Sequence, residues 1–187
     1  MYTTIMVPTD CSGFDREAIR VALRLAEKSQ AKVHLVRVSA SASFFGIAAS
    51  DGLVLPAEAL QQELDAELAE LHALAAECRT ITTAAVTTSL EQGPTADVLA
   101  GYAKRNDVDL IVMSTHGRSG FARLSLGSVT DSLVRLTAIP VLVVKPPREL
   151  RRIERVADRV ALPAVGLHLG DAAVHLFQPA GLGRGEQ

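Results

Sequence analysis

Short apolar runs alternate with longer amphipathic stretches along most of this chain. The runs are rich in β-branched and other apolar residues and are bounded by polar, glycine or proline residues, which is typical of buried strands. They cover residues 3–9, 32–38, 81–90, 108–114 and 139–145. Between them, apolar residues recur at helical spacing, which predicts helices over residues 12–31, 57–79, 93–106 and 128–137. The clearest helix is 57–79, where one stripe is formed by Leu60, Leu64, Leu68, Leu71 and Leu74.

The strict alternation of strands and helices determines the expected fold class. It predicts an α/β protein with a single doubly wound, five-stranded parallel sheet and helices on both faces, of the Rossmann-like kind. A length of 187 residues suits one domain. We therefore expect one α/β domain over residues 1–147.

Two segments do not follow this alternation. Residues 39–56 have no clear period and are predicted to form a long loop. Its Phe44-Phe45 pair could belong to a lid or to a dimer contact, and both remain open. Residues 148–187 follow a Pro146-Pro147 stop and are interrupted by glycine and proline beyond Pro163. We treat them as a C-terminal extension of uncertain order.

Composition narrows the function classes. A net charge of −2, 4% aromatic residues and no tryptophan give no indication of nucleic-acid binding. No run of about 18 apolar residues is present, so no membrane span is expected. Cys11 and Cys78 form no CxxC pair, which favours free thiols in a reducing compartment. The first residues lack the basic and apolar regions of a signal peptide, and we expect a cytoplasmic protein.

The loop between the fourth strand and the last helix carries most of the candidate chemistry. It reads STHGRSGFARLSLGS over residues 114–128, far longer than the roughly 2–6 residues such a connection needs. Gly127 and Ser128 directly precede a helix, whose free N–H groups and positive dipole end suit a phosphate. Gly127 would allow close approach and a positive φ. The alternative is that Ser128 is only the helix N-cap.

A second candidate is Asp10, at the end of the first predicted strand in VPTDCS. Ligands of open parallel sheets lie at the carboxyl ends of the strands, near the point where strand order reverses. There a carboxylate could meet a ribose hydroxyl or a cation. The alternative is that Asp10 caps the next helix or forms an Asx-turn.

These residues together resemble the universal stress protein family over roughly residues 1–146. The family's nucleotide motif, G-x2-G-x9-G-[ST], corresponds here to Ser114, Gly117 and Gly127-Ser128, with the nine-residue spacer 118–126 intact. VPTDCS, DVDLIVMSTHGRSG, LGSVTDSLV and IPVLVVK are also similar to the family's sequences, in the same order.

The resemblance implies a fold of the adenine-nucleotide hydrolase-like type. It also implies that a subset of the family binds ATP with Mg²⁺ or Mn²⁺, while another subset lacks the motif and does not. Carried over by position, Asp10 and Val38 would lie near adenine and ribose. Gly117 would let the loop approach the phosphates, which Gly127, Ser128 and Val129 would bind. The full predicted nucleotide-binding set is Pro8, Thr9, Asp10, Val38, Met113, Ser114, Gly117, Arg118, Gly127, Ser128 and Val129.

One position departs from the motif, because Ser114 stands where the family has glycine. If this position needs a positive φ, serine costs about 1 kcal/mol of strain. Three functions stay open: an ATP-binding regulatory module of the stress response, a nucleotide-free dimeric interaction protein, and a weakly ATP-hydrolysing or autophosphorylating protein. The sequence contains no Walker lysine motif, which argues against an efficient ATP-hydrolysing enzyme.

The last predicted strand is an apolar edge that would invite uncontrolled pairing if left open. The resemblance implies a homodimer through Val141 to Val144. The alternative is that the 148–187 tail folds back over the same strand.

Overall fold

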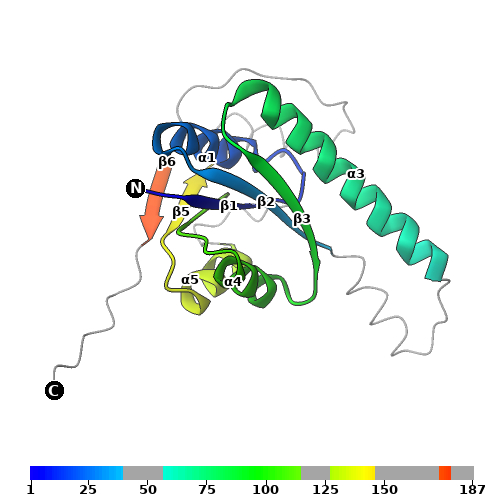
Figure 1. The fold of residues 1–187 in the computed structure, drawn as a ribbon. Helices are drawn as coiled ribbons and strands as arrows, with labels where there is room; N and C mark the ends of the chain where they lie inside the picture. Colours follow the sequence, from blue (N-terminus) through cyan, green and yellow to red (C-terminus); the bar gives the residue numbers. More distant parts are fainter. Residues whose placement is uncertain (40–56, 115–126, 146–172, 178–187) are drawn as a thin grey trace, which may run out of the picture.

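A six-stranded sheet with the strand order β3-β2-β1-β4-β5-β6 forms the centre of the molecule (Figure 1). The computed structural model describes residues 1–39, 57–114, 127–145 and 173–177. The strands are β1 (Thr4–Pro8), β2 (Lys32–Ser39), β3 (Val86–Gln92), β4 (Leu110–Ser114), β5 (Val141–Lys145) and β6 (Ala173–Phe177). Strands β1 to β5 run parallel to one another, which confirms the predicted five-stranded parallel sheet.

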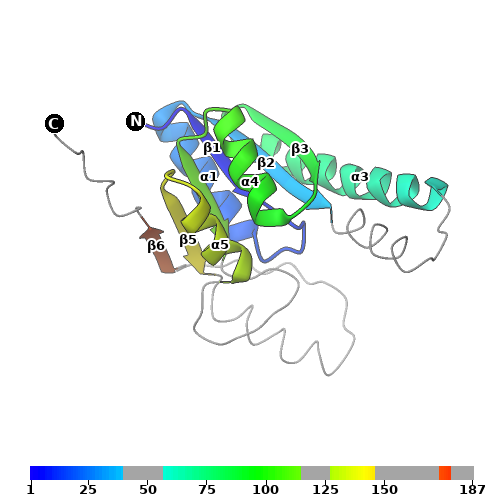
Figure 2. The same cartoon turned by 90° about the horizontal axis from the view of Figure 1, so that it is seen from below.

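Two pairs of helices cover the two faces of the sheet. Figure 1 shows α1 and α3 above the sheet and α4 and α5 below it, and Figure 2 shows the same layers from another side. The helices are α1 (Arg16–Ser29), α3 (Ala57–Ile81), α4 (Thr95–Arg105) and α5 (Ser128–Leu136). The prediction of helices on both faces is therefore confirmed. No helix in the described ranges is both long and apolar enough to cross a membrane.

Each face of the sheet has its own apolar core, because side chains of a strand alternate between faces. Ile5 and Val7 of β1 pack towards α1 and α3, whereas Met6 between them packs towards α4 and α5. All three have no exposed surface, as expected for a central parallel strand covered on both sides. On α3, Leu71 of the predicted leucine stripe is fully buried, and the amino-terminal end of the helix extends away from the sheet (Figure 1).

Two predicted boundaries were wrong. Helix α1 begins at Arg16 rather than at Ser12, because residues 10–13 form a turn. The strand predicted at 81–90 begins at Val86, since α3 continues to Ile81 and Thr82 starts a turn in which its Oγ1 accepts a hydrogen bond from the Ala84 N–H. The predicted loop segment 40–56, including Phe44-Phe45, lies outside the described residues.

The tail contributes a strand that the sequence did not predict. β6 pairs antiparallel with β5, from Val141 opposite Phe177 to Lys145 opposite Ala173. In this chain, the edge predicted to bind a second subunit is thus covered by residues of the C-terminal extension. Of the two alternatives for this edge, the structure shows the one in which the tail pairs with β5.

Candidate functional site

The order of the strands places a topological switch point between β1 and β4. From β1 the chain continues outwards to β2 and β3, whereas from β4 it continues in the opposite direction to β5. The carboxyl ends of β1 and β4 are therefore flanked by connections that diverge, which leaves room for a ligand at this edge. Pro8 and Ser114 are the last residues of the two strands.

The described residues of the predicted nucleotide-binding set lie along this one edge. Pro8, Thr9 and Asp10 are at the end of β1, Val38 is near the end of β2, and Met113 and Ser114 end β4. Gly127, Ser128 and Val129 form the start of α5, which leads back to the amino end of β5. Gly117 and Arg118 lie outside the described residues. The sequence set therefore maps onto three adjacent strand ends and one helix start.

A tight turn follows β1 and fixes the backbone of Asp10. Asp10 Oδ1 accepts a hydrogen bond of 3.0 Å from the Ser12 N–H, which is an Asx-turn. Cys11 has a φ of +58°, a left-handed conformation that costs a non-glycine residue about 1 kcal/mol or more. Gly13 follows with a φ of +86°. The Asx-turn alternative for Asp10 is thus present, while its position at the strand end also matches the nucleotide-site prediction.

The Thr9 side chain belongs to this turn. Its Oγ1 donates a short hydrogen bond to Asp15 Oδ2 and accepts one of 3.0 Å from the Cys11 N–H. The Thr9 N–H donates to the Val36 carbonyl at 2.9 Å, which joins the turn to β2. The N–H and O–H donors of Thr9 are therefore both used within the protein, so a ligand contact from Thr9 would use an acceptor group.

Asp15 is an acidic group held out of water beside the turn. It is 4% exposed, and its Oδ1 has no hydrogen-bond partner among the described residues. Burial raises the pKa of Asp15 above its ordinary value of 3.8, and the hydrogen bond from Thr9 opposes this rise only in part. Compared with the unfolded chain, the fold therefore shifts this carboxyl towards its protonated form.

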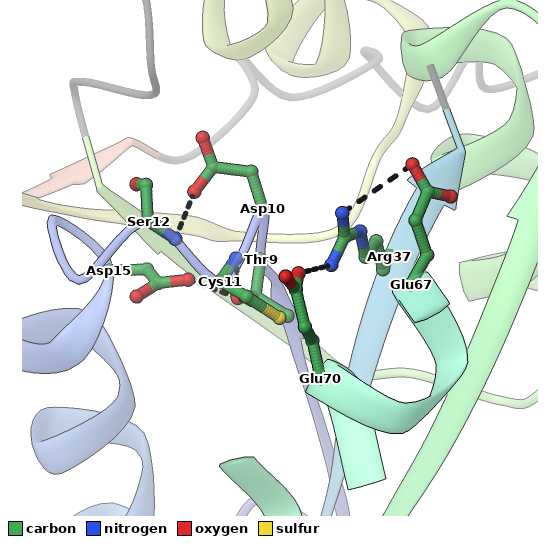
Figure 3. Close-up of polar contacts among 8 residues, drawn as sticks. All are labelled: Thr9, Asp10, Cys11, Ser12, Asp15, Arg37, Glu67 and Glu70. Atoms are coloured by element: carbon green, nitrogen blue, oxygen red, sulfur yellow. Dashed lines mark hydrogen bonds and ion pairs between the residues drawn. The ribbon is translucent and has the colours of Figure 1, made fainter. Parts of the chain in front are cut away.

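On the α3 side of the same edge, Arg37 lies between two glutamates (Figure 3). Its Nη1 is 2.6 Å from Glu70 Oε2 and its Nη2 is 3.4 Å from Glu67 Oε1. Arg37 and Glu67 are 5% and 8% exposed, whereas the Glu70 side chain is about half exposed. This ion-pair cluster of Arg37, Glu67 and Glu70 fastens α3 to β2.

Sequence reasoning missed this cluster. The available signals were an arginine inside the apolar run KVHLVRV and two glutamates at i, i+3 beside the leucine stripe of α3.

Cys11 lies next to the cluster in Figure 3. Burial raises the pKa of the Cys11 thiol, and the neighbouring Thr9 and Arg37 oppose this rise without cancelling it. The surroundings of Cys11 thus favour the thiol over the thiolate.

The start of α5 differs in detail from its prediction. Gly127 is the N-cap residue with a φ of −51°, so the positive φ that glycine would allow is not used. Ser128 is the first helical residue rather than the cap, and no side-chain hydrogen bond caps the helix. The first intrahelical bond runs from the Asp131 N–H to the Gly127 carbonyl at 2.9 Å. The N–H groups of residues 128–130 therefore lack intrahelical partners, which is the arrangement an anion requires.

Ser114 is free of the strain considered for its position. It is the last residue of β4, and the described non-glycine residues with positive φ are Cys11, Gln30 and Asp107. Serine therefore occupies an ordinary extended conformation at the place where the family motif has glycine.

A separate hollow lies at the opposite end of the sheet. It has a volume of about 550 Å³ and is lined by residues near the start of β1 and β2 and after α3, among them Thr3, Lys32 and Thr83. Glu27 on its wall already accepts a hydrogen bond of 2.8 Å from Thr82 Oγ1. Because this end of a parallel sheet carries neither the switch point nor the helix start, it is not the candidate site.

A doubly wound parallel sheet with a polar turn and a helix start at its switch point defines the class of Rossmann-like ligand-binding domains. Within this class, residues 1–145 match the universal stress protein family, and the chain belongs to that family. Universal stress protein MJ0531 of Methanocaldococcus jannaschii is 32% identical over 149 residues, which is 80% of this chain and 85% of the relative. Universal stress protein YxiE of Bacillus subtilis is 26% identical over 148 residues, 78% of this chain and the whole of the relative.

Solved structures agree with this fold. Hypothetical protein MJ0577 has a TM-score of 0.62 at 23% identity, covering 79% of this chain and 98% of its own. A universal stress protein in complex with cAMP has a TM-score of 0.56 at 21% identity, with 78% and 98% covered. The universal stress protein of Archaeoglobus fulgidus in complex with dAMP has a TM-score of 0.55 at 17% identity, with 76% and 97% covered. At these identities the likeness shows the fold.

Proposed function

We propose that this chain is an ATP-binding regulatory module of the stress response, which takes ATP with Mg²⁺ or Mn²⁺ at the switch point of the sheet. The observation that carries the proposal is the position of the α5 start, whose first N–H groups have no intrahelical partners and follow the connection from the end of β4. Family members of the same fold in complex with cAMP and dAMP support adenine as the base.

In this proposal each segment of the edge has one role. Asp10 and Val38 contact adenosine from the ends of β1 and β2, and Met113 and Ser114 lie beneath it. Gly127, Ser128 and Val129 bind phosphate oxygens through their N–H groups, with the dipole of α5 favouring the negative charge. Val129 also packs against the core between α4 and α5, which fixes the start of the helix. The cation accompanies the phosphates of the nucleotide.

The proposed module acts by binding rather than by turnover. ATP would shift the chain between states according to its different affinity for each, and at most slow hydrolysis or autophosphorylation would occur. We propose a cytoplasmic location and, once β6 leaves the edge of β5, pairing with a second copy through Val141 to Val144. The competing function is a nucleotide-free interaction protein, which the Asx-turn at Asp10 favours because it gives that residue a structural role.

Calorimetric titration of nucleotide-free protein with Mg-ATP tests the proposal. The expected result is saturable binding near one ATP per chain, abolished in Gly127→Glu because a carboxylate would occupy the anion position at the start of α5. Gln62→Glu, on the exposed surface of α3, is the matched control for the added charge. Absence of binding by ATP, ADP and AMP to the parent chain would favour the interaction protein instead. Equal binding by Gly127→Glu and the parent would place the nucleotide elsewhere.

A further inference from the structure

The last strand of the sheet, β6, comes from a part of the chain outside the family domain. The family match ends at residue 145, and β6 spans Ala173–Phe177. The chain covers the whole of the Bacillus subtilis relative and 98% of MJ0577, yet about a fifth of this chain is left uncovered by each. These two proteins are thus matched almost in full by a part of this chain that leaves about a fifth of it over.

The strand that β6 covers would be a hazard if it were left as an edge. With β6 in place, Val141, Val143 and Val144 are each 1% exposed, and the strand contributes to the cores on both faces. A flat apolar strand with unpaired N–H and C=O groups is a template for pairing with another chain. Pairing of the outer edge of β5 with another strand removes this hazard.

The direction of β6 bears on which other strand could pair with the outer edge of β5. When identical edge strands of two copies pair about a two-fold axis, they run antiparallel. β6 also runs antiparallel to β5, with paired residues along the whole strand from Val141–Phe177 to Lys145–Ala173. β6 thus pairs with the same N–H and C=O groups of β5, and in the same direction, as the β5 strand of a second copy would.

We propose that β6 is a built-in competitor for the dimer edge: it keeps the chain monomeric by covering β5, and its displacement exposes β5 for a second copy. The inference rests on the pairing through β5 given under the proposed function, but not on nucleotide binding. A strand on the same chain pairs intramolecularly, which favours it over a second copy at ordinary protein concentrations. The extension therefore acts as an interaction switch added to the family domain, which ends at residue 145.

Proline in β6 tests this in the full-length chain. In an antiparallel ladder, alternate residues direct their N–H groups towards the neighbouring strand, so one of any two consecutive residues donates to it. Val174→Pro/His175→Pro therefore removes one donor to β5 and disrupts the strand, wherever the ladder begins. Gly181→Pro/Leu182→Pro, beyond β6 in the same extension, is the matched control.

The measurement is molar mass by light scattering after size exclusion, over a wide concentration range, with circular dichroism to confirm folding. The expected result is one chain for the parent and the control, and a twofold larger mass for Val174→Pro/His175→Pro. A parent that is already a dimer overturns the competitor, and a loss of that dimer in the variant would mean that β6 is exchanged between copies. If Val174→Pro/His175→Pro and a chain ending at Lys145 are both folded monomers, the competitor role of β6 and the pairing through β5 are both refuted. Since none of these measurements involves nucleotide, failure here leaves the ATP proposal intact.

Discussion

The Arg37 guanidinium of β2 lies 3.4 Å from the Glu67 carboxylate of α3, and both side chains are almost fully buried. Removing one member of a buried ion pair leaves the other charge uncompensated, which costs about 3–5 kcal/mol. Replacing both members by apolar residues of similar volume is often neutral. The ion pair therefore gives a clear test of what fastens α3 to the sheet.

We expect Arg37→Met to lower the free energy of unfolding by about 3 kcal/mol. The double variant Arg37→Met/Glu67→Met should recover most of this loss, because no buried charge then remains at these two positions. Urea denaturation of the parent, both single variants and the double variant gives the coupling energy of the pair. Additive losses would show that the two charges do not depend on each other.

The buried Asp15 predicts a pH dependence of known sign. Burial raises its pKa in the folded chain above the ordinary 3.8. Between these two values the folded chain binds a proton that the unfolded chain does not, so the free energy of unfolding decreases as pH rises through this window. Asp15→Asn removes this contribution, so its stability relative to the parent should increase as pH rises above 3.8.

Denaturation curves of both proteins at several pH values check this, with Asp65→Asn on the exposed surface of α3 as the control for one lost carboxylate. His34, whose pKa is lowered by burial, contributes a slope of opposite sign. Because His34 is present in both proteins, its contribution cancels in the difference. If the difference in unfolding free energy between Asp15→Asn and the parent does not change with pH, the raised pKa of Asp15 is refuted.

The parts of the fold that follow from local pattern could be predicted from the sequence. β1, β4 and β5 are apolar runs with clear boundaries, and their alternation with amphipathic helices is enough to predict a parallel sheet. β6 could not be predicted, because a five-residue strand in a segment rich in glycine and proline is defined by pairing with β5 rather than by its own pattern.

The candidate site also contains some features that the sequence predicts and others that it does not. The positions of Asp10, Ser114 and Gly127 at strand ends and a helix start follow from sequence order and topology. The ion-pair cluster of Arg37, Glu67 and Glu70 does not, because it joins residues about 30 positions apart whose contact depends on how α3 packs on β2. The left-handed Cys11 also gives no signal, since glycine is the residue usually expected there.

A hydrogen bond inside the core between β2 and α4 gives a third prediction. His34 Nδ1 and Tyr102 Oη are 3.0 Å apart, and both residues are buried. Tyr102→Phe leaves a buried imidazole nitrogen without this partner and should cost about 1 kcal/mol of unfolding free energy. Tyr2→Phe is the matched control, because the Tyr2 hydroxyl has no hydrogen bond among the described residues. Thermal denaturation separates the two, and equal losses would contradict a specific role for the bond.

The last prediction concerns the serine that replaces the first glycine of the nucleotide motif. Because Ser114 ends β4 without a positive φ, changing it to glycine relieves no strain and only adds freedom to the unfolded chain. Ser114→Gly should therefore lower the free energy of unfolding by about 0.5–1 kcal/mol and leave the affinity for Mg-ATP no higher than that of the parent.

A glycine that the fold does require provides the contrast for Ser114. Gly93 has a φ of +123°, and a Cβ there would lie 3.0 Å from Val98 Cγ2. Gly93→Ala should cost more than Ser114→Gly, by at least about 1 kcal/mol, because it combines a strained backbone with a steric overlap. Urea denaturation and Mg-ATP titration of the two variants measure stability and affinity separately. A gain of stability in Ser114→Gly would mean that the serine is strained after all, and a gain of affinity alone would mean that its side chain obstructs the nucleotide.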